Sequence, residues 1–342
     1  MSVGVWFPTL GLLAWLCCLS LGPVQGGKVL VLPVDGSHWL SMKILVKELN
    51  QRGHEVLVLV PDSSLLIHSS ESFKTEVYPV SFTKADLDGR FEQLTEGLFL
   101  KPPQMTDIFL NVQRLVSFTS LQSAEGRGFD LVLTDPFLPC GKPMPSPPSY
   151  VPAAFSGNTN IMTFPQRVKN MLMSGVESYM CRIIYSNFDD LVSRHLEEKM
   201  TYKELISYGA IWLLRYDFTF EWPKPIMPNM AFIGGINCAK KAPLPEIKEF
   251  VDGSGDDGFI VFTLGSMVSN MPEETAKQFF EAFRQLPQRV LWRYTGVPPK
   301  DAPKNVKLMK WLPQNDLLGM QSFIQTDVLG AYINHNIQTN SS

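Results

Sequence analysis

Hydrophobic and polar positions along residues 27 to 60 change their period twice. A continuous apolar run, Val29 to Leu32, stops at Pro33, apolar positions then recur at helical spacing over residues 42–49, and a second continuous run covers residues 56–60. Continuous runs are typical of buried strands, and a period of about 3.6 is typical of a helix that covers one face. Gly53 stands where a helix commonly ends. The pattern therefore predicts a βαβ unit with two buried strands.

Apolar runs of both kinds continue to about residue 240. They predict helices over residues 106–119 and 164–198, and strands over residues 75–80, 129–133, 211–214 and 230–233. The strand at residues 129–133 is expected to be buried, like the first two. Residues 141–152 are rich in proline and are expected to hold no regular structure.

The pattern changes again after residue 240. Residues 240–258 are interpreted as linker and loop, with a domain boundary there, and their G-S-G-D-D-G run is not a dinucleotide fingerprint because it precedes the next strand. That strand covers residues 259–264, and Asn270 is expected to cap a following helix that runs through Phe283. Strands are expected at residues 290–293 and 306–309. Alternating strands and helices predict an α/β fold.

Length and charge narrow the function classes. A chain of 342 residues favours two domains, and a net charge of -3 gives no basic field for nucleic acid. Residues 1–26 resemble a secretory signal, with an apolar core and a small-residue cleavage site. A signal anchor is the alternative, although the apolar run is shorter than the roughly 20 residues that a span needs.

Three cysteines follow the predicted signal, namely Cys140, Cys181 and Cys238. No two of them have the C-x-x-C spacing of a zinc or redox site. In an oxidising compartment one pair could form, with one thiol left over. No later stretch is apolar for long enough to predict a membrane span.

Two side chains are candidates for proton transfer at one edge of the predicted sheet. His38 lies in the loop after the first strand, and Asp135 follows the strand at residues 129–133. Ligands of open α/β sheets bind at the carboxyl ends of the strands. A histidine oriented by a carboxylate is suited to act as a general base. The alternatives are that His38 is a helix N-terminal residue satisfied by its loop and that Asp135 begins a turn.

Four more residues stand at the ends of predicted strands in the second half. Ser266 lies in a Gly-Ser turn between a strand and a helix, where backbone N–H groups can meet a phosphate. Arg293 could pair with phosphate, Trp311 could stack on a base, and Gln314 could hydrogen-bond it. A surface charge, a core aromatic residue and a polar loop residue are the corresponding structural alternatives.

Longer motifs carry a family resemblance. The chain resembles a vertebrate UDP-glucuronosyltransferase of family one from its signal to Gly319, in the segments VDGSHWLSMK, DLVLTDPFLPCG, MTFPQRVKNML, PIMPNMAFIGGINC, IVFTLGSMVS, VLWRYTG and KWLPQNDLLG. The resemblance implies two Rossmann-like domains that face a cleft, the GT-B type. The N-terminal domain, residues 27–240, would take a small lipophilic acceptor, and the C-terminal domain, from residue 241, would take UDP-glucuronic acid.

The resemblance also implies roles for the candidate residues. His38 would deprotonate the acceptor hydroxyl, with Asp135 orienting it, and the sugar would be transferred with inversion. Ser266 and Arg293 would contact phosphate. The uracil would stack on Trp311 and hydrogen-bond Gln314. No metal is implied.

Two departures from the family pattern are visible. Only residues 142–146 stand where the family has several dozen residues of strand and helix, which would belong to the sheet and pocket wall of the acceptor domain. After Gly319 the sequence differs from the rest of the donor signature, so His335 is given no role. The resemblance therefore predicts an incomplete C-terminal domain, without the family's transmembrane helix.

Three functions follow from the resemblance. The first is transfer of glucuronic acid to a lipophilic hydroxyl compound in the lumen of the endoplasmic reticulum. The second is an inactive, shortened subunit that associates with full-length family members and modulates them, as part of a homo- or hetero-oligomer. The third is transfer from another UDP-sugar.

Overall fold

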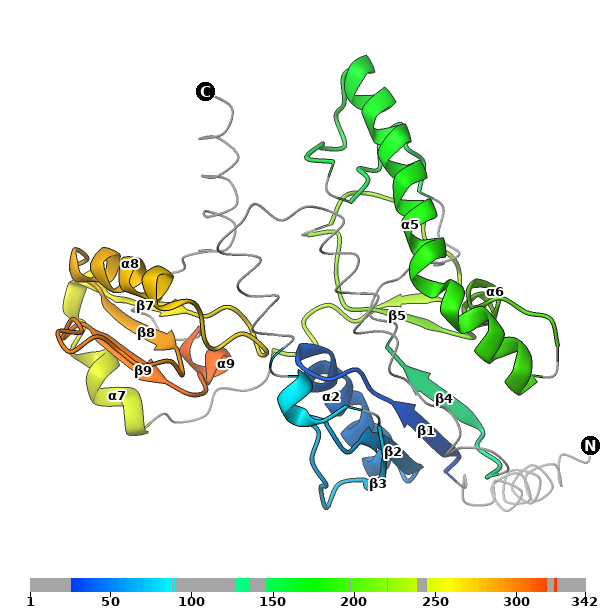
Figure 1. Cartoon of the computed structure of the whole chain (residues 1–342), viewed down its shortest axis with the longest axis horizontal. Helices are drawn as coiled ribbons and strands as arrows, with labels where there is room; N and C mark the ends of the chain where they lie inside the picture. Colours follow the sequence, from blue (N-terminus) through cyan, green and yellow to red (C-terminus); the bar gives the residue numbers. More distant parts are fainter. Residues whose placement is uncertain are drawn as a thin grey trace, which may run out of the picture. The chain divides into compact units, whose positions relative to one another are not determined.

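The computed structural model describes most of the chain between residues 26 and 324 (Figure 1). The described residues are 26–80, 82–87, 89, 127–135, 146–154, 156–196, 198–219, 221–238, 245–318 and 323–324. The predicted signal, the predicted helix at residues 106–119, Cys140 and His335 lie outside them. Within these ranges, no helix combines the length and the apolar character that crossing a membrane requires.

The first sheet has four parallel strands. They are β1 (Lys28–Leu32), β2 (Glu55–Pro61), β3 (Lys74–Tyr78) and β4 (Leu131–Thr134), in the order β3-β2-β1-β4. Helix α2 (Ser37–Gln51) connects β1 to β2, which confirms the predicted βαβ unit.

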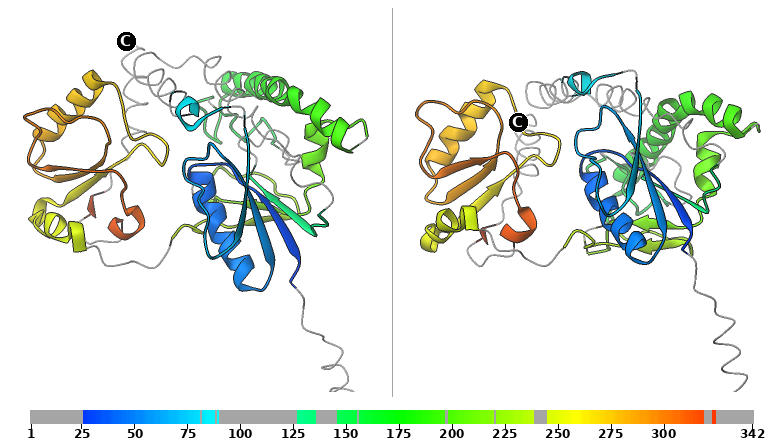
Figure 2. Two further views of the ribbon diagram at one scale, coloured as in Figure 1. Left: turned by 60° about the horizontal axis from the view of Figure 1, so that its bottom comes forward. Right: turned by 90° about the horizontal axis from the view of Figure 1, so that it is seen from below.

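Helix α2 covers one face of this sheet (Figure 2). Trp39, Met42 and Val46 are buried on the helix and pack against valines of β1 and β2. Gly53 follows the helix C-cap with a φ of 88°, a left-handed conformation that glycine adopts without steric strain. The helical spacing seen in the sequence is therefore the spacing of the buried face.

Strand β4 differs from its prediction. It pairs with β1 at the edge of the sheet, and Leu131 and Val132 are 47% and 53% exposed. The prediction of a buried strand here was wrong, because an apolar run by itself does not distinguish an edge strand from a central one.

A second group of elements spans residues 146–238. It contains the long helix α5 (Phe164–Leu196), the short helix α6 (Tyr202–Ser207), and the parallel pair β5 (Trp212–Leu214) and β6 (Met230–Phe232). Helix α6 packs on α5 through stacked rings of Tyr185 and Tyr202, whose centroids are 4.6 Å apart. These elements confirm the predicted helix at 164–198 and both predicted short strands, and residues 146–152 form no helix or strand, as expected.

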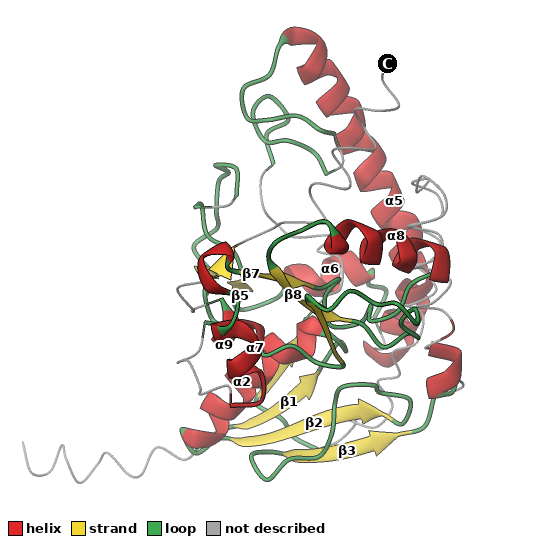
Figure 3. Ribbon diagram, turned by 90° about the vertical axis from the view of Figure 1, so that its left-hand side faces the viewer, coloured by secondary structure: helices red, strands yellow, loops and turns green. Residues whose placement is uncertain are grey.

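The second parallel sheet lies between two helices (Figures 1 and 3). Its strands are β7 (Phe259–Phe262), β8 (Arg289–Arg293), β9 (Val306–Met309) and β10 (Phe323–Ile324), in the order β10-β7-β8-β9. Helix α8 (Glu273–Arg284) packs on the face that contains Phe262 and Trp292. Helix α7 (Pro245–Asp252) packs on the opposite face, against Phe259 and Leu291.

Two predictions were wrong around this sheet. Residues 245–252 form α7 rather than a loop, and Ile247 and Val251 are buried on it at helical spacing. Asn270 does not cap α8, whose first residue is Glu273 and whose N-cap is Pro272. A cap at Asn270 would require a helical backbone at Met271, which precedes a proline and is therefore disfavoured in that conformation.

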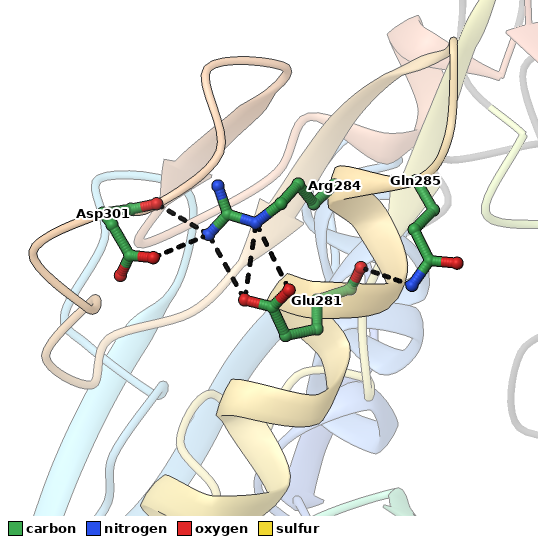
Figure 4. Close-up of polar contacts among 4 residues, drawn as sticks. All are labelled: Glu281, Arg284, Gln285 and Asp301. Carbon is green, nitrogen blue, oxygen red and sulfur yellow. Dashed lines mark hydrogen bonds and ion pairs between the residues drawn. The ribbon is translucent and has the colours of Figure 1, made fainter.

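A polar cluster joins α8 to the connection between β8 and β9 (Figure 4). Arg284 donates from Nη2 to the backbone oxygen of Asp301 at 2.8 Å and to its carboxylate at 3.0 Å, and it also contacts Glu281 at 3.3 Å. These side chains are partly exposed, so the cluster adds little to stability and mainly orders the connection.

The chain divides into two compact units. One contains β1 to β4 with α2, and the other contains α5, α6, β5, β6 and the second sheet. The α/β class and the parallel sheets predicted from the sequence are confirmed, and the predicted domain boundary near residue 240 stays a prediction.

Candidate functional site

His38 is the second residue of α2, directly after the turn that ends β1. Gly36 precedes the helix with a φ of 78° and is buried, so a side chain at this position would be strained. Trp39, which is 1% exposed, packs edge to face on Phe73 with centroids 5.5 Å apart. The turn and the buried tryptophan together determine where the His38 backbone lies.

Asp135 reaches the same edge of the first sheet by a different route. It follows Thr134, the last residue of β4, which is paired with Leu32 at the end of β1. Because β1 and β4 are parallel neighbours, both carboxyl ends meet at one edge. The prediction that His38 and Asp135 share an edge is confirmed.

The two side chains are in direct contact. His38 Nδ1 lies 2.8 Å from Asp135 Oδ2, and the side chains are 23% and 20% exposed. An ionised carboxylate only accepts hydrogen bonds, so Nδ1 carries the proton in this pair and Nε2 is the basic nitrogen. The geometry is that of a histidine oriented by a carboxylate.

Sequence reasoning missed a second carboxylate in this region. Asp35 accepts four hydrogen bonds from its own turn and from residues 64–66. The sequence shows Asp35 as an aspartate that precedes a glycine at the end of a strand. Most of its partners are backbone N–H groups, and a sequence does not indicate which of these face a given carboxylate.

The four candidate residues of the second half follow strands of the second sheet. Ser266 lies in the turn after β7, Arg293 is the last residue of β8, and Trp311 lies two residues after β9. Gln314 is the first residue of the short helix α9 (Gln314–Leu317) and is exposed. Because β7, β8 and β9 are parallel, the first three residues lie at one edge of the sheet.

Arg293 binds the chain itself with most of its guanidinium. It donates to the backbone oxygens of Gly265 (2.6 Å), Val268 (3.0 Å) and Ser266 (3.0 Å), and from Nε to that of Lys310 (3.2 Å). These bonds use four of the five N–H groups of an arginine. Burial lowers the pKa of Arg293, which still remains charged at neutral pH. Arg293 therefore orders the turn after β7.

Trp311 presents an open ring at this edge. Trp311 is 47% exposed, and the Arg293 guanidinium lies 5.2 Å from the ring centroid. Such an indole, supported by a cation on one side, can offer a surface for stacking an aromatic base. Among the described residues, no group of three or more His, Cys, Asp or Glu side chains could hold a metal ion.

Two of the three cysteines after the predicted signal are among the described residues, and which cysteines pair stays a prediction. Cys181 is disulfide-bonded, and Cys238 is free and exposed.

Comparison with known proteins identifies the class of protein that carries these sites. The family model described as "UDP-glucoronosyl and UDP-glucosyl transferase" matches residues 27–145 and 141–335. The chain belongs to this family of glycosyltransferases, which confirms the resemblance seen in its motifs.

Curated relatives specify the family further. The chain is 52% identical over 305 residues to the UDP-glucuronosyltransferase of Pleuronectes platessa, covering 76% of this chain and 65% of the relative. It is 40% identical over 346 residues to UDP-glucuronosyltransferase 1A1 of Rattus norvegicus, covering 89% and 65%. The chain thus spans about two thirds of the length of these relatives.

Solved structures similar to the chain are also glycosyltransferases. The glycotransferase of kitacinnamycin matches with a TM-score of 0.47 and 15% identity, covering 84% of this chain and 72% of that one. The calicheamicin glycosyltransferase matches with a TM-score of 0.44 and 16% identity, covering 88% and 74%.

The family match also bears on the two departures noted in the sequence. Its two segments meet at residues 141–145, where the chain is expected to be shortened, and the second segment continues past Gly319 to residue 335. The shortening and the limits of the last segment stay predictions.

Proposed function

We propose that this chain transfers glucuronic acid from UDP-glucuronic acid to the hydroxyl group of a small lipophilic acceptor, with His38 as the general base. The observation that carries the proposal is the 2.8 Å contact between His38 Nδ1 and Asp135 at the carboxyl edge of the first sheet. Membership of a family of UDP-sugar transferases supplies the donor class.

The proposed step is a direct displacement. His38 Nε2 takes the proton of the acceptor hydroxyl as its oxygen forms a bond to the anomeric carbon of the sugar. The bond between that carbon and the UDP oxygen breaks, and UDP leaves with the electron pair, so the configuration at the anomeric carbon is inverted. Asp135 stabilises the imidazolium that forms and keeps the ring in the productive tautomer.

The donor is proposed to bind along the carboxyl edge of the second sheet. The diphosphate would meet the backbone N–H groups of the turn that contains Ser266. Arg293 would hold that turn through its bonds to three of the turn's carbonyl oxygens and add positive charge behind it. The uracil would stack on Trp311 and hydrogen-bond Gln314. This scheme uses no metal.

The proposal also includes the cellular location and the oligomeric state of the chain. The predicted signal supports the lumen of the endoplasmic reticulum as the location. The chain is also proposed to form an oligomer, either with a second copy of itself or with full-length family members.

The test measures product formed by the 342-residue chain from 1-naphthol and UDP-glucuronic acid. The wild-type chain should form the β-glucuronide, and His38→Gln should reduce its rate by about 10²-fold to 10⁴-fold. His68→Gln, at an exposed histidine of the same unit, is the matched control and should keep the wild-type rate. Equal rates for His38→Gln and wild type would refute the role of His38. Absence of product from the wild-type chain would favour the inactive, associating subunit instead.

A further inference from the structure

Asp35 uses both of its carboxylate oxygens to join two loops. Oδ1 accepts from the backbone N–H groups of Gly36 (2.8 Å) and Leu66 (3.1 Å). Oδ2 accepts from the Ser64 hydroxyl (2.8 Å) and the Leu65 N–H (2.7 Å). Four such bonds fill the usual accepting capacity of a carboxylate.

The second of these loops is attached to the core of the first unit. Ser64 is 3% exposed, and its hydroxyl also accepts from the Ile67 N–H at 3.1 Å. Ile67 is 4% exposed and belongs to the same core cluster as Trp39 and Phe73. The loop after β2 is therefore a fixed support, and Asp35 ties the loop after β1 to it.

His38 lies only three residues after Asp35 in the sequence. The N-cap of its helix is Gly36, which provides no side-chain capping bond, so the start of α2 lacks the usual cap. On the other side of His38, the buried Trp39 fixes the backbone in the core. Only Ser37 and His38 therefore lie between the hydrogen-bonded Asp35–Gly36 turn and the buried Trp39. Both ends of this short backbone segment, which carries the imidazole, are fixed.

We propose that Asp35 is a positioning residue for the transfer reaction. It fixes the backbone from which His38 projects, whereas Asp135 orients the imidazole ring itself. This inference rests on the proposed role of His38 and adds a second carboxylate to the site. A base misplaced by as little as 1 Å loses much of its effect, on the order of 10²-fold in rate.

The substitution Asp35→Asn tests this role because it keeps the shape of the side chain. An amide oxygen still accepts two hydrogen bonds, but the amide N–H₂ group now faces two donors. We expect the turnover rate to fall by about 10-fold to 100-fold, with little change in the KM for UDP-glucuronic acid. The nitrogen-bound proton of His38 Nδ1, followed by NMR in the same full-length chain, should shift or broaden.

The matched control is Asp130→Asn. Asp130 accepts a backbone hydrogen bond from Lys28 at 2.7 Å at the opposite end of β1, so it tests the loss of a carboxylate in the same sheet away from the site. Its turnover rate and its His38 resonance should equal those of the wild type.

Ser64→Ala supplies a second, milder variant. It removes one of the four hydrogen bonds to Asp35, so a smaller shift of the His38 resonance is expected. If Asp35→Asn fails to fold, Ser64→Ala alone tests whether Asp35 positions His38. Folded variants with a wild-type His38 resonance would overturn the proposal. The NMR measurement does not require turnover, so it separates failure of this inference from failure of the proposed function.

Discussion

Replacing Asp135 with asparagine tests the central pair most informatively. The substitution preserves size but removes the negative charge 2.8 Å from His38 Nδ1. The proposed role of this charge lies in the transition state rather than in substrate binding. In the proposed transition state the ring becomes an imidazolium, and the carboxylate then attracts it.

The expected effect follows from the distance. Two unit charges 2.8 Å apart attract each other by about 6 kcal/mol at an effective dielectric constant of about 20, and by about 3 kcal/mol at about 40. Both side chains are about one-fifth exposed, so solvent screening favours the lower value. A loss of about 3 kcal/mol in transition-state stabilisation corresponds to a rate lower by about 10²-fold.

A second effect acts in the same direction. The asparagine amide can donate a hydrogen bond to Nδ1, which leaves the proton on Nε2, the atom that must act as the base. The turnover rate of Asp135→Asn is therefore expected to fall by about 10²-fold to 10⁴-fold, while the KM for both substrates stays within a few-fold of wild type.

The assay is initial-rate glucuronidation of 1-naphthol by the full chain, with thermal unfolding measured in parallel. Asp130→Asn, at a carboxylate beside the opposite end of β1, should keep the wild-type rate. A folded Asp135→Asn chain with a turnover rate within about threefold of wild type would contradict the electrostatic argument.

Two further predictions concern the second sheet. Trp311→Ala should weaken binding of UDP by about 5-fold to 150-fold, because stacking on a base contributes about 1–3 kcal/mol. Calorimetric titration measures the affinity for UDP. Trp222→Ala, at another exposed tryptophan, is the control and should bind UDP as the wild type does. Arg293→Lys should lower the free energy of unfolding by about 2–4 kcal/mol, since a lysine cannot replace the four carbonyl bonds. Urea unfolding that matches wild type would show that these bonds do not order the turn.

The sequence predicted best where the hydrophobic period alone determines the structure. The βαβ unit at residues 28–61 follows from such a local pattern. The contact between His38 and Asp135 joins residues 97 positions apart, yet it could be predicted because parallel strands end at the same edge. Helix α7 was missed because its charged residues made a short amphipathic helix resemble a linker.

Backbone partners explain most of what the sequence did not predict. Asp35 and Arg293 were both visible as charged residues at strand ends, but most of their partners are N–H groups or carbonyl oxygens. Every residue carries these groups, so a sequence does not indicate which of them face a given side chain. The exposure of β4 was likewise unpredictable, because it depends on which strand occupies the edge.

The most direct test of the account is the rate of β-glucuronide formation by the wild-type chain and by His38→Gln at saturating UDP-glucuronic acid. The account predicts a measurable rate for the wild type and a rate lower by at least about 10²-fold for the variant. A variant as fast as the wild type, or a wild-type chain that forms no glucuronide, would contradict it.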